Sequence, residues 1–294
     1  MGRGAPVAAR PQARAMSRIR TLSLTALAMV AFAGNSLLCR VALKHTAIDP
    51  ATFTAVRITS GAIVLALLVR LRGGTLAGRG SWRSALTLIV YAIAFSFAYV
   101  TLPASTGALL LFGAVQATMI GAGVAMGERP NAVQIAGIAL AVIGLVVLLA
   151  PGLSAPPAAG AALMLLAGVF WGIYSLRGRG AGDPAEVTAG NFARAAPFAL
   201  AAALLYASRT RIDAAGAGYA VASGALASGV GYVIWYTALP GLRATSAAVV
   251  QLSVPVIASL GGYLLLGEPV TARLAIASVA ILGGIAMVVG ARHR

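Results

Sequence analysis

Ten runs of roughly 20 mostly apolar residues follow one another along the chain, and each is long enough for a helix to cross a bilayer. They lie near residues 22–43, 51–70, 83–102, 104–125, 131–150, 158–176, 187–207, 216–237, 244–266 and 271–290. Hydrophobic residues make up 60% of the 294 residues and charged residues only 10%, where soluble proteins have roughly 25% charged residues. A soluble core cannot hide so much apolar surface. The sequence therefore predicts an all-α integral membrane protein with ten transmembrane helices.

The 22 lysine and arginine residues are spread unevenly over the connecting segments. If the N-terminus is cytoplasmic, fifteen lie on cytoplasmic segments and five on outer segments, while Arg57 and Arg194 lie within spans. Cytoplasmic loops of membrane proteins are enriched in these residues. We therefore expect a multi-pass protein of a bacterial inner membrane with both termini in the cytoplasm. The bias also accounts for the net charge of +16. Because no aromatic and basic patch forms a groove, nucleic acid is not an expected partner.

Five arginines precede the first apolar run, and Ala31-Phe32-Ala33 within that run resembles the cleavage site of a signal peptide. The run nevertheless continues to about residue 43, which is long enough to span, and it has a counterpart in the second half of the chain. We expect residues 1–20 to be a disordered, basic, cytoplasmic tail and the run to be the first span.

The sequence repeats internally, with offsets of 134 to 140 residues between matching segments. The matching pairs are Asp49-Pro50 with Asp183-Pro184, Tyr99 to Pro103 with Tyr236 to Pro240, and Ala104 to Gly144 with Ala244 to Gly284. The two repeats, residues 21–151 and 157–291, would each hold five spans. Because five is odd, the second repeat enters the membrane from the opposite side. Two inverted five-helix repeats are typical of secondary transporters, whose substrate site lies near the midplane between the repeats.

Several short motifs resemble those of the drug/metabolite transporter superfamily, and specifically its EamA-type exporters. The motifs are Arg57, Gly127-Glu128, Trp171-Gly172, Trp235 to Leu239 and Gly267-Glu268. The first span departs from the pattern, because Ala33-Gly34 stands where the family has Trp-Gly. The resemblance covers residues 20–292, twice over, and implies a transporter that works as a monomer. Within the family the chain is similar to amino-acid and metabolite exporters, including the YddG-type exporters of aromatic amino acids.

Few polar or aromatic side chains lie deep within the predicted spans. We expect a midplane cavity lined by Asn35, Phe95, Tyr99, Phe112, Gln116, Trp171, Tyr174, Tyr232, Trp235 and Gln251. Ligand sites combine apolar and aromatic walls with a few placed polar groups, and Asn35 with Gln116 or Gln251 would orient the solute. Alternatively, Trp and Tyr form belts at the membrane interfaces, and Asn and Gln link helices. We expect the belt for Trp82 and Tyr91, and both interpretations stay open for Tyr99, Trp171 and Gln251.

The charged residues near the membrane have simpler interpretations. Arg57 and Arg194 each lie about two helical turns from the end of a span, so both can extend their guanidinium groups to the interface. Neither is our first choice for binding a substrate carboxylate. None of the six acidic residues lies in the middle of a span. Glu128 and Glu268 are expected to bind backbone N–H groups at the start of the next helix, and the alternative is that they form a gate.

These observations predict an inner-membrane transporter that exports small amphipathic metabolites, above all amino acids, aromatic ones included, by alternating access between two inverted halves. Its partners would be the small-molecule substrate and the lipid bilayer. The alternative is a proton-coupled multidrug efflux antiporter, which the absence of a mid-span acid disfavours. A membrane enzyme or scaffold is a third possibility. No nucleophile–base pair or cluster of metal-binding side chains is evident, so we expect no catalytic residue, metal or cofactor.

Overall fold

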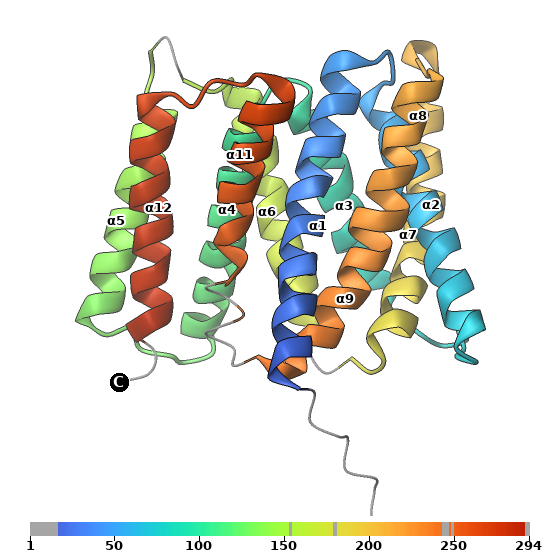
Figure 1. Cartoon of the computed structure of the whole chain (residues 1–294), viewed down its shortest axis with the longest axis horizontal. Helices are drawn as coiled ribbons and strands as arrows, with labels where there is room; N and C mark the ends of the chain where they lie inside the picture. The colour runs from blue at the N-terminus through green and yellow to red at the C-terminus, as the bar shows by residue number, and fades with distance from the viewer. Residues whose placement is uncertain (1–16, 153–154, 179–180, 243–246, 248–249, 292–294) are drawn as a thin grey trace, which may run out of the picture.

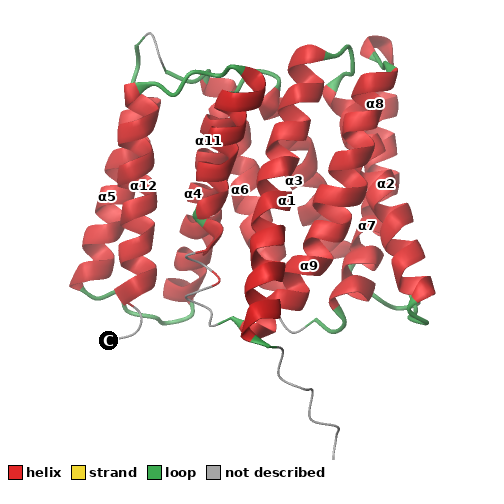
Figure 2. Ribbon diagram, viewed as in Figure 1, coloured by secondary structure: helices red, strands yellow, loops and turns green. Residues whose placement is uncertain are grey.

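A computed structural model of the chain describes residues 17–152, 155–178, 181–242, 247 and 250–291. Every regular element in these ranges is a helix (Figure 2). Residues 1–16 of the predicted tail lie outside the described part, and α1 begins at Arg18, within the stretch expected to be the tail.

The first half of the chain forms α1 (Arg18–His45), α2 (Pro50–Leu71), α3 (Trp82–Tyr99), α4 (Ala104–Ala125) and α5 (Ala132–Leu149). The second half forms α6 (Ala158–Gly178), α7 (Pro184–Leu205), α8 (Ala214–Val221), the π-helix η2 (Ala222–Val230), α9 (Gly231–Ala238), α11 (Ser253–Leu266) and α12 (Ala272–Gly290). Single turns of 3₁₀ helix, η1 (Ala207–Arg209) and η3 (Leu239–Gly241), follow α7 and α9.

Among the described residues, eight helical segments are long and apolar enough to cross a membrane, and α8, η2, α9 and η3 together make one of them. Two further segments complete the predicted set. The 14-residue α11 is shorter than the others, and the preceding part of its predicted span lies largely outside the described residues. The 22-residue α7 is long enough but less apolar, because Asn191, Arg194 and Pro197 lie within it. Each of the ten predicted spans therefore corresponds to a helical segment, as the sequence predicts.

The two halves run in opposite directions through the bundle. The chain passes up and down in turn, so that α1 and α6 begin at opposite ends, and α12 ends where α1 begins (Figure 1). We call the two ends the Arg18 end and the Glu268 end, because α1 begins at the first and the α11–α12 loop lies at the second. Gly127-Glu128 follows α4 at the Arg18 end, whereas Gly267-Glu268 follows α11 at the Glu268 end. The inverted repeat that the sequence predicts is present in the fold.

The halves interlock instead of forming two separate bundles. Helix α6 packs against α3 and α4 of the first half, and α1 packs in the equivalent way against α9 and α11 of the second. Equivalent helices also pair with each other, α2 with α7 and α5 with α12. The α5–α12 pair is close because a Cβ on Gly137 would lie 2.6 Å from the Gly284 carbonyl oxygen, as is common where small residues let membrane helices approach.

Repeated residues start and end equivalent helices for the same physical reasons. Asp49 accepts hydrogen bonds from the N–H groups of Ala51 and Thr52 at the start of α2, and Asp183 caps α7 in the same way. A proline follows each aspartate, at a position where the missing N–H costs nothing. After α4 and its counterpart α11, Gly127 and Gly267 adopt φ angles of 96° and 61°. Only glycine takes this left-handed conformation readily, which explains the glycine of each Gly-Glu motif.

Candidate substrate site

A cluster of aromatic rings joins the two halves in the middle of the bundle. Trp171 of α6 lies at the centre of the cluster, with ring centroids 4.7 Å from Tyr232 of α9, 5.0 Å from Tyr91 of α3 and 6.1 Å from Phe32 of α1. All four side chains are buried. We call this contact zone of α1, α3, α6 and α9 the seam. It lies where an inverted-repeat transporter is expected to bind its solute.

Most of the residues predicted for the site lie at the seam. Asn35, Phe95, Phe112, Trp171 and Tyr232 line one small cavity, together with Phe32, Ser36, Tyr91 and Leu111. Three other predicted residues contact this set through their rings. The ring centroid of Tyr99 lies 4.8 Å from that of Phe95, Tyr174 stacks on Trp171 with centroids 5.5 Å apart, and the centroids of Trp235 and Phe32 are 5.9 Å apart.

The two predicted glutamines do not line this cavity in the described part of the chain. Gln116 is buried on α4. Gln251 is also buried, and its side-chain amide donates to the Ala247 carbonyl oxygen, 3.3 Å away.

The cavity at the seam is almost closed. Its volume is about 10 Å³, which is room for about one water molecule. The rings themselves fill the space in which a solute was expected. The structure therefore has no solute-sized space at the predicted midplane cavity among the described residues, because the aromatic side chains of the two halves pack on one another. A solute can bind there only when some of these rings move apart.

Arg57 is the principal residue of the seam that the sequence interpretation missed. Its side chain does not reach the interface but is buried, with 1% of the residue exposed. Its Nε donates to the Ser228 hydroxyl at 3.2 Å and its Nη2 to the Tyr91 hydroxyl at 3.0 Å, while its buried Nη1 has no partner. The guanidinium also lies 4.9 Å from the centre of the Phe95 ring. The prediction that Arg57 extends to the interface is wrong.

The sequence does contain a signal for the position of Arg57. Thr54 and Gly61 share its face of α2, three residues before and four residues after it, and both are buried. Large apolar residues such as Ile63 and Leu67 are exposed on another side of the helix. Since the face of a membrane helix that contacts lipid is its apolar face, the small residues beside Arg57 indicate that it faces inward. Arg194 behaves as predicted, because its guanidinium lies over the Trp82 ring and donates to the carbonyl oxygens of Arg79 and Gly190.

Tyr91 also differs from its prediction, whereas Trp82 agrees. Trp82 is 58% exposed at the start of α3, where an interfacial belt is expected. Tyr91 is buried at the seam instead, and its hydroxyl accepts hydrogen bonds from Arg57 and from the Asn35 side chain, the latter at 3.3 Å. Asn35 and Arg57 thus share one acceptor, and the three side chains form a polar network among the rings.

The π-helix η2 contributes the second half of this network. The Ser223 hydroxyl donates to Asn35 Oδ1 at 2.6 Å, and Ser228 contacts both Asn35 and Arg57. Residues five apart point to different sides of an α-helix with 3.6 residues per turn, but they lie nearly above one another where bonding runs from i to i+5. The π-helix therefore directs both hydroxyls to the seam. The backbones are also close, because a Cβ on Gly224 would overlap the Arg57 carbonyl group.

The Glu268 end of the seam is sealed by a buried ion pair. Arg40 of α1 places its Nε 2.8 Å from Glu268 Oε1, and its Nη1 donates to the Tyr99 carbonyl oxygen at 2.9 Å. The other carboxylate oxygen accepts from the Ala104 N–H at 2.7 Å, at the start of α4. Glu268 thus binds the N-terminus of a helix, as predicted. That helix is α4 of the other half, whereas the prediction named the next helix of the chain. Its repeat counterpart, Glu128, is exposed.

A larger cavity lies at the Arg18 end. Its volume is about 480 Å³, and Tyr174, Asn191, Tyr236 and Ala247 are among its described lining residues. Asn191 donates to the Tyr174 hydroxyl at 3.3 Å, and Tyr174 stacks on Trp171 of the central cluster. The Tyr174 ring therefore lies between this cavity and Trp171 of the seam. A pocket of about 610 Å³ also lies at the Glu268 end, where residues such as Thr46, Asp49 and Arg211 line it between the α1–α2 and α7–α8 connections. The two ends of the seam differ in what borders the aromatic cluster, since the Glu268 end has the buried ion pair and the Arg18 end has the cavity beside Tyr174.

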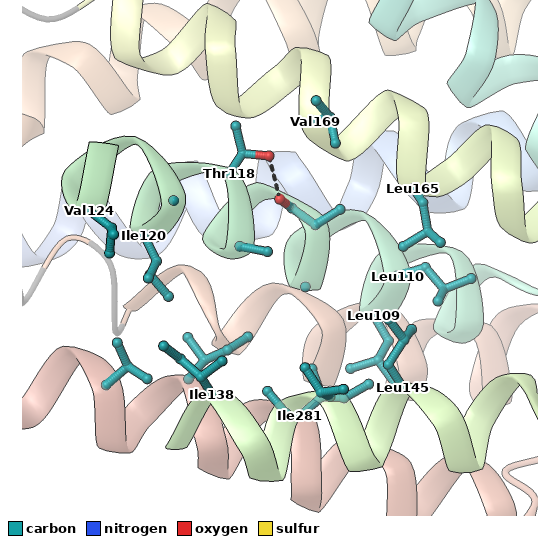
Figure 3. Close-up of a pocket in the computed structure, with 18 residues that line it drawn as sticks. Leu109, Leu110, Thr118, Ile120, Val124, Ile138, Leu145, Leu165, Val169 and Ile281 are labelled. Atoms are coloured by element: carbon teal, nitrogen blue, oxygen red, sulfur yellow. Dashed lines mark hydrogen bonds between the residues drawn. The ribbon is translucent and has the colours of Figure 1, made fainter. Parts of the chain in front are cut away.

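An apolar groove of about 510 Å³ lies to one side of the seam, between α4 and α6 and the α5–α12 pair (Figure 3). Leucine, isoleucine and valine side chains such as Leu110, Leu145 and Ile281 line it (Figure 3). The Thr118 hydroxyl in its wall donates to the Ala114 carbonyl oxygen of its own helix at 2.8 Å. The groove therefore suits hydrocarbon and offers little for recognising a polar solute.

The sequence that carries these features matches a known family. The sequence profile of the EamA-like transporter family matches residues 19–150 and, a second time, residues 158–290. The chain belongs to the EamA-like transporter family. Its membership confirms the resemblance to the drug/metabolite transporter superfamily and makes the chain a multi-pass membrane transporter.

Relatives of this EamA-like transporter cover nearly its whole length. It is 59% identical over 274 residues to an uncharacterised protein of Pseudomonas aeruginosa, with 93% of this chain and 96% of the relative covered. An uncharacterised transporter of Archaeoglobus fulgidus is 25% identical over 289 residues, with 94% and 99% covered. A crystal structure with 22% identity matches 90% of this chain and 98% of that one at a TM-score of 0.65, so the two share a fold.

Proposed function

We propose that this EamA-like transporter exports small amphipathic metabolites, amino acids above all and aromatic ones among them, from the cytoplasm of a bacterium. It lies in the inner membrane with both termini in the cytoplasm, and it works as a monomer whose two halves enclose the solute. The observation that carries the proposal is the seam itself. There, aromatic rings and a small polar network from both halves meet in one place, as ligand sites typically combine them.

The difference between the two ends of the seam supports alternating access. The Arg40–Glu268 pair closes the Glu268 end, while a cavity reaches toward Trp171 from the Arg18 end. Because the halves are inverted copies, an exchange of their conformations would close the Arg18 end instead. Glu128 is the repeat counterpart of Glu268, and α6 ends near Arg177, as α1 carries Arg40 near its end. In the exchanged state Glu128 moves toward the end of α6.

The positions of the acidic residues favour facilitated diffusion over proton coupling. Asp49, Glu128, Asp183, Glu186, Asp213 and Glu268 are all the acids of the chain, and each lies in a connection or in the first turn of a helix. A proton-coupled antiporter usually uses a carboxylate within the membrane. The alternative of proton-coupled multidrug efflux therefore lacks its expected carrier group, and the solute gradient is the proposed driving force.

Efflux from proteoliposomes tests the proposal. Vesicles loaded with labelled amino acids should lose aromatic ones faster when they contain the transporter than when they lack protein, and Trp171→Ala should slow that loss. Imposing a pH gradient should leave the rate unchanged. No transporter-dependent movement of any of the amino acids would contradict the proposal, and drug efflux that follows the pH gradient would favour the antiporter.

A further inference from the structure

We propose that Arg57 binds a carboxylate group of the solute, and that a single negative charge beside an apolar or aromatic group is what the seam recognises. The transport of such a solute rests on the proposed function, but the binding of the anion does not.

The positive charge of Arg57 has no acidic partner. All six Asp and Glu residues lie in the described part, and the ion pairs found there are Arg40–Glu268 and Arg79–Glu186. The Arg57 guanidinium is held only by neutral groups, the hydroxyls of Tyr91 and Ser228 and the faces of two rings. An unpaired charge within a membrane is costly, and arginines in such places usually serve a solute or ion pathway. A bound anion would supply the missing counter-charge.

The donors of Arg57 leave a vacant pair of adjacent N–H groups. A guanidinium has five N–H donors. Nε uses its N–H on Ser228 and Nη2 uses one of two on Tyr91, whereas buried Nη1 donates to nothing. The remaining N–H of Nη2 and an N–H of Nη1 form the fork that a carboxylate accepts in a bidentate way. Arg57 is therefore fixed on one side by the protein and open to an anion on the other.

The guanidinium lies beside the small cavity at the seam. Two of the rings that line that cavity, Tyr91 and Phe95, are the rings over which Arg57 lies. Asn35 lines the cavity as well and shares the Tyr91 hydroxyl with Arg57. Because Tyr91 contacts both the guanidinium and the cavity, a movement of its ring would open the cavity toward the fork, and Trp171 and Tyr232 would contact the apolar part of the solute.

The equivalent position in the second half carries no charge. Arg57 is the seventh residue after Pro50 at the start of α2, and Asn191 is the seventh after Pro184 at the start of α7. Asn191 is neutral and donates to Tyr174. One cation at the seam matches one monoanion. None of the six Asp and Glu residues lies at the seam to bind an ammonium group. The amino group of an amino acid therefore contributes little to recognition.

Thermal stabilisation of the purified full-length transporter in detergent tests this inference with three matched probes. The probes are 3-phenylpropionate, its neutral amide and 2-phenylethylamine, and inorganic phosphate is added as a second anion. We expect the acid to raise the melting temperature, and the amide, the amine and phosphate to leave it unchanged. Arg57→Gln should weaken binding of the acid about tenfold or more, Arg57→Lys should weaken it less, and Arg194→Gln, a matched loss of charge near the surface, should not change it.

Several outcomes would overturn the inference. Stabilisation by the amide equal to that by the acid would show that the charge is not recognised, a comparison that needs no variant. Stabilisation by phosphate alone would assign another class of anion. Undiminished binding by a folded Arg57→Gln variant would place the site elsewhere. Export of phenylalanine by Arg57→Gln at the wild-type rate would contradict the inference while leaving the proposed function intact. Binding of the acid without export of any amino acid would contradict only the proposed function.

Discussion

Tyr91 and Ser228 occupy equivalent positions in the two repeats, 137 residues apart, and both bind the same guanidinium, that of Arg57. The offset is the one that relates Tyr99 to Tyr236. One charged group is therefore held by the first half through a phenol and by the second half through a serine of a π-helix. A change in the relative position of the halves must change the contacts of Arg57, which couples its environment to the state of the transporter.

The ion pair at the Glu268 end should hold that end of the seam closed. Glu268→Gln removes the charge partner of a buried Arg40, and losing one member of a buried pair costs about 3–5 kcal/mol. We expect a lower melting temperature. We also expect faster labelling of a cysteine at Ser36, in a Cys39→Ser background, by a reagent added from the Glu268 side. The exchange variant, Arg40→Glu with Glu268→Arg, should recover part of the loss, and a double variant no better than the worse single one would contradict the pairing.

Asp49 should stabilise the fold more than its counterpart Asp183. Both cap a helix, but Asp49 also accepts from the Arg211 N–H at 3.0 Å, in the loop of the other half. Replacing a capping aspartate by alanine costs about 1 kcal/mol, so both variants should have a lower melting temperature than wild type. Asp49→Ala should have the lower melting temperature of the two, because it also loses the contact with Arg211.

The contribution of Asp49 should depend on pH. Burial alone would raise the pKa of Asp49, but hydrogen bonds from Thr52, Arg211 and Ala51 hold it below its ordinary value of 3.8. A lowered folded pKa gives stabilisation that is complete above the ordinary pKa and is lost as the pH falls through the lowered one. The melting difference between wild type and Asp49→Ala should therefore shrink below about pH 3.8. A difference that grows in acid would contradict this sign.

The contact of α2 with the π-helix should not tolerate a methyl group. A Cβ on Gly224 would overlap the Arg57 carbonyl group, so Gly224→Ala must push η2 away from α2 and disturb both serines. We expect strongly reduced export and a lower melting temperature. Gly218→Ala is the matched control, because nothing lies within 4 Å of its Cβ in α8, and alanine there should stabilise the helix by up to about 1 kcal/mol. Equal effects of the two substitutions would argue against the close packing.

Cysteine labelling should establish the orientation of the chain. Cys39 is a buried free cysteine, so a Cys39→Ser background removes the native thiol. A cysteine at Arg209 should react with a membrane-impermeant maleimide in whole cells, and one at Ala291 should react only after the cells are opened. The reverse pattern would show that the Glu268 end faces the cytoplasm.

The fold can be predicted from the sequence because lipid imposes simple rules on each span. The apolar runs, the Asp-Pro starts of α2 and α7, and the Gly-Glu ends of α4 and α11 are all local, and their repetition at similar offsets indicates the inversion. The same logic placed Phe95, Trp171 and Tyr232 at the seam. These residues are aromatic, lie deep in their spans and lie on helices from both repeats.

The rest depended on which face each helix turns inward and on backbone shape. Depth along the span alone predicts an interfacial position for Arg57 and Tyr91, whereas the packing of α2 and α3 turns both toward the seam. The π-helix brings Ser223 and Ser228 together through an i to i+5 pattern, and their spacing does not reveal this when an α-helix is assumed. The closed cavity results from how rings of five helices fit together, which no single segment encodes.

An experimentally determined structure of the transporter with bound 3-phenylpropionate or phenylalanine tests the central claim most directly. We predict that the ligand lies at the seam, with its carboxylate against Nη1 and Nη2 of Arg57, its ring among Phe95, Trp171 and Tyr232, and the Tyr91 ring rotated. A ligand bound instead in the apolar groove between α4, α6 and the α5–α12 pair, with Arg57 unchanged, would contradict it.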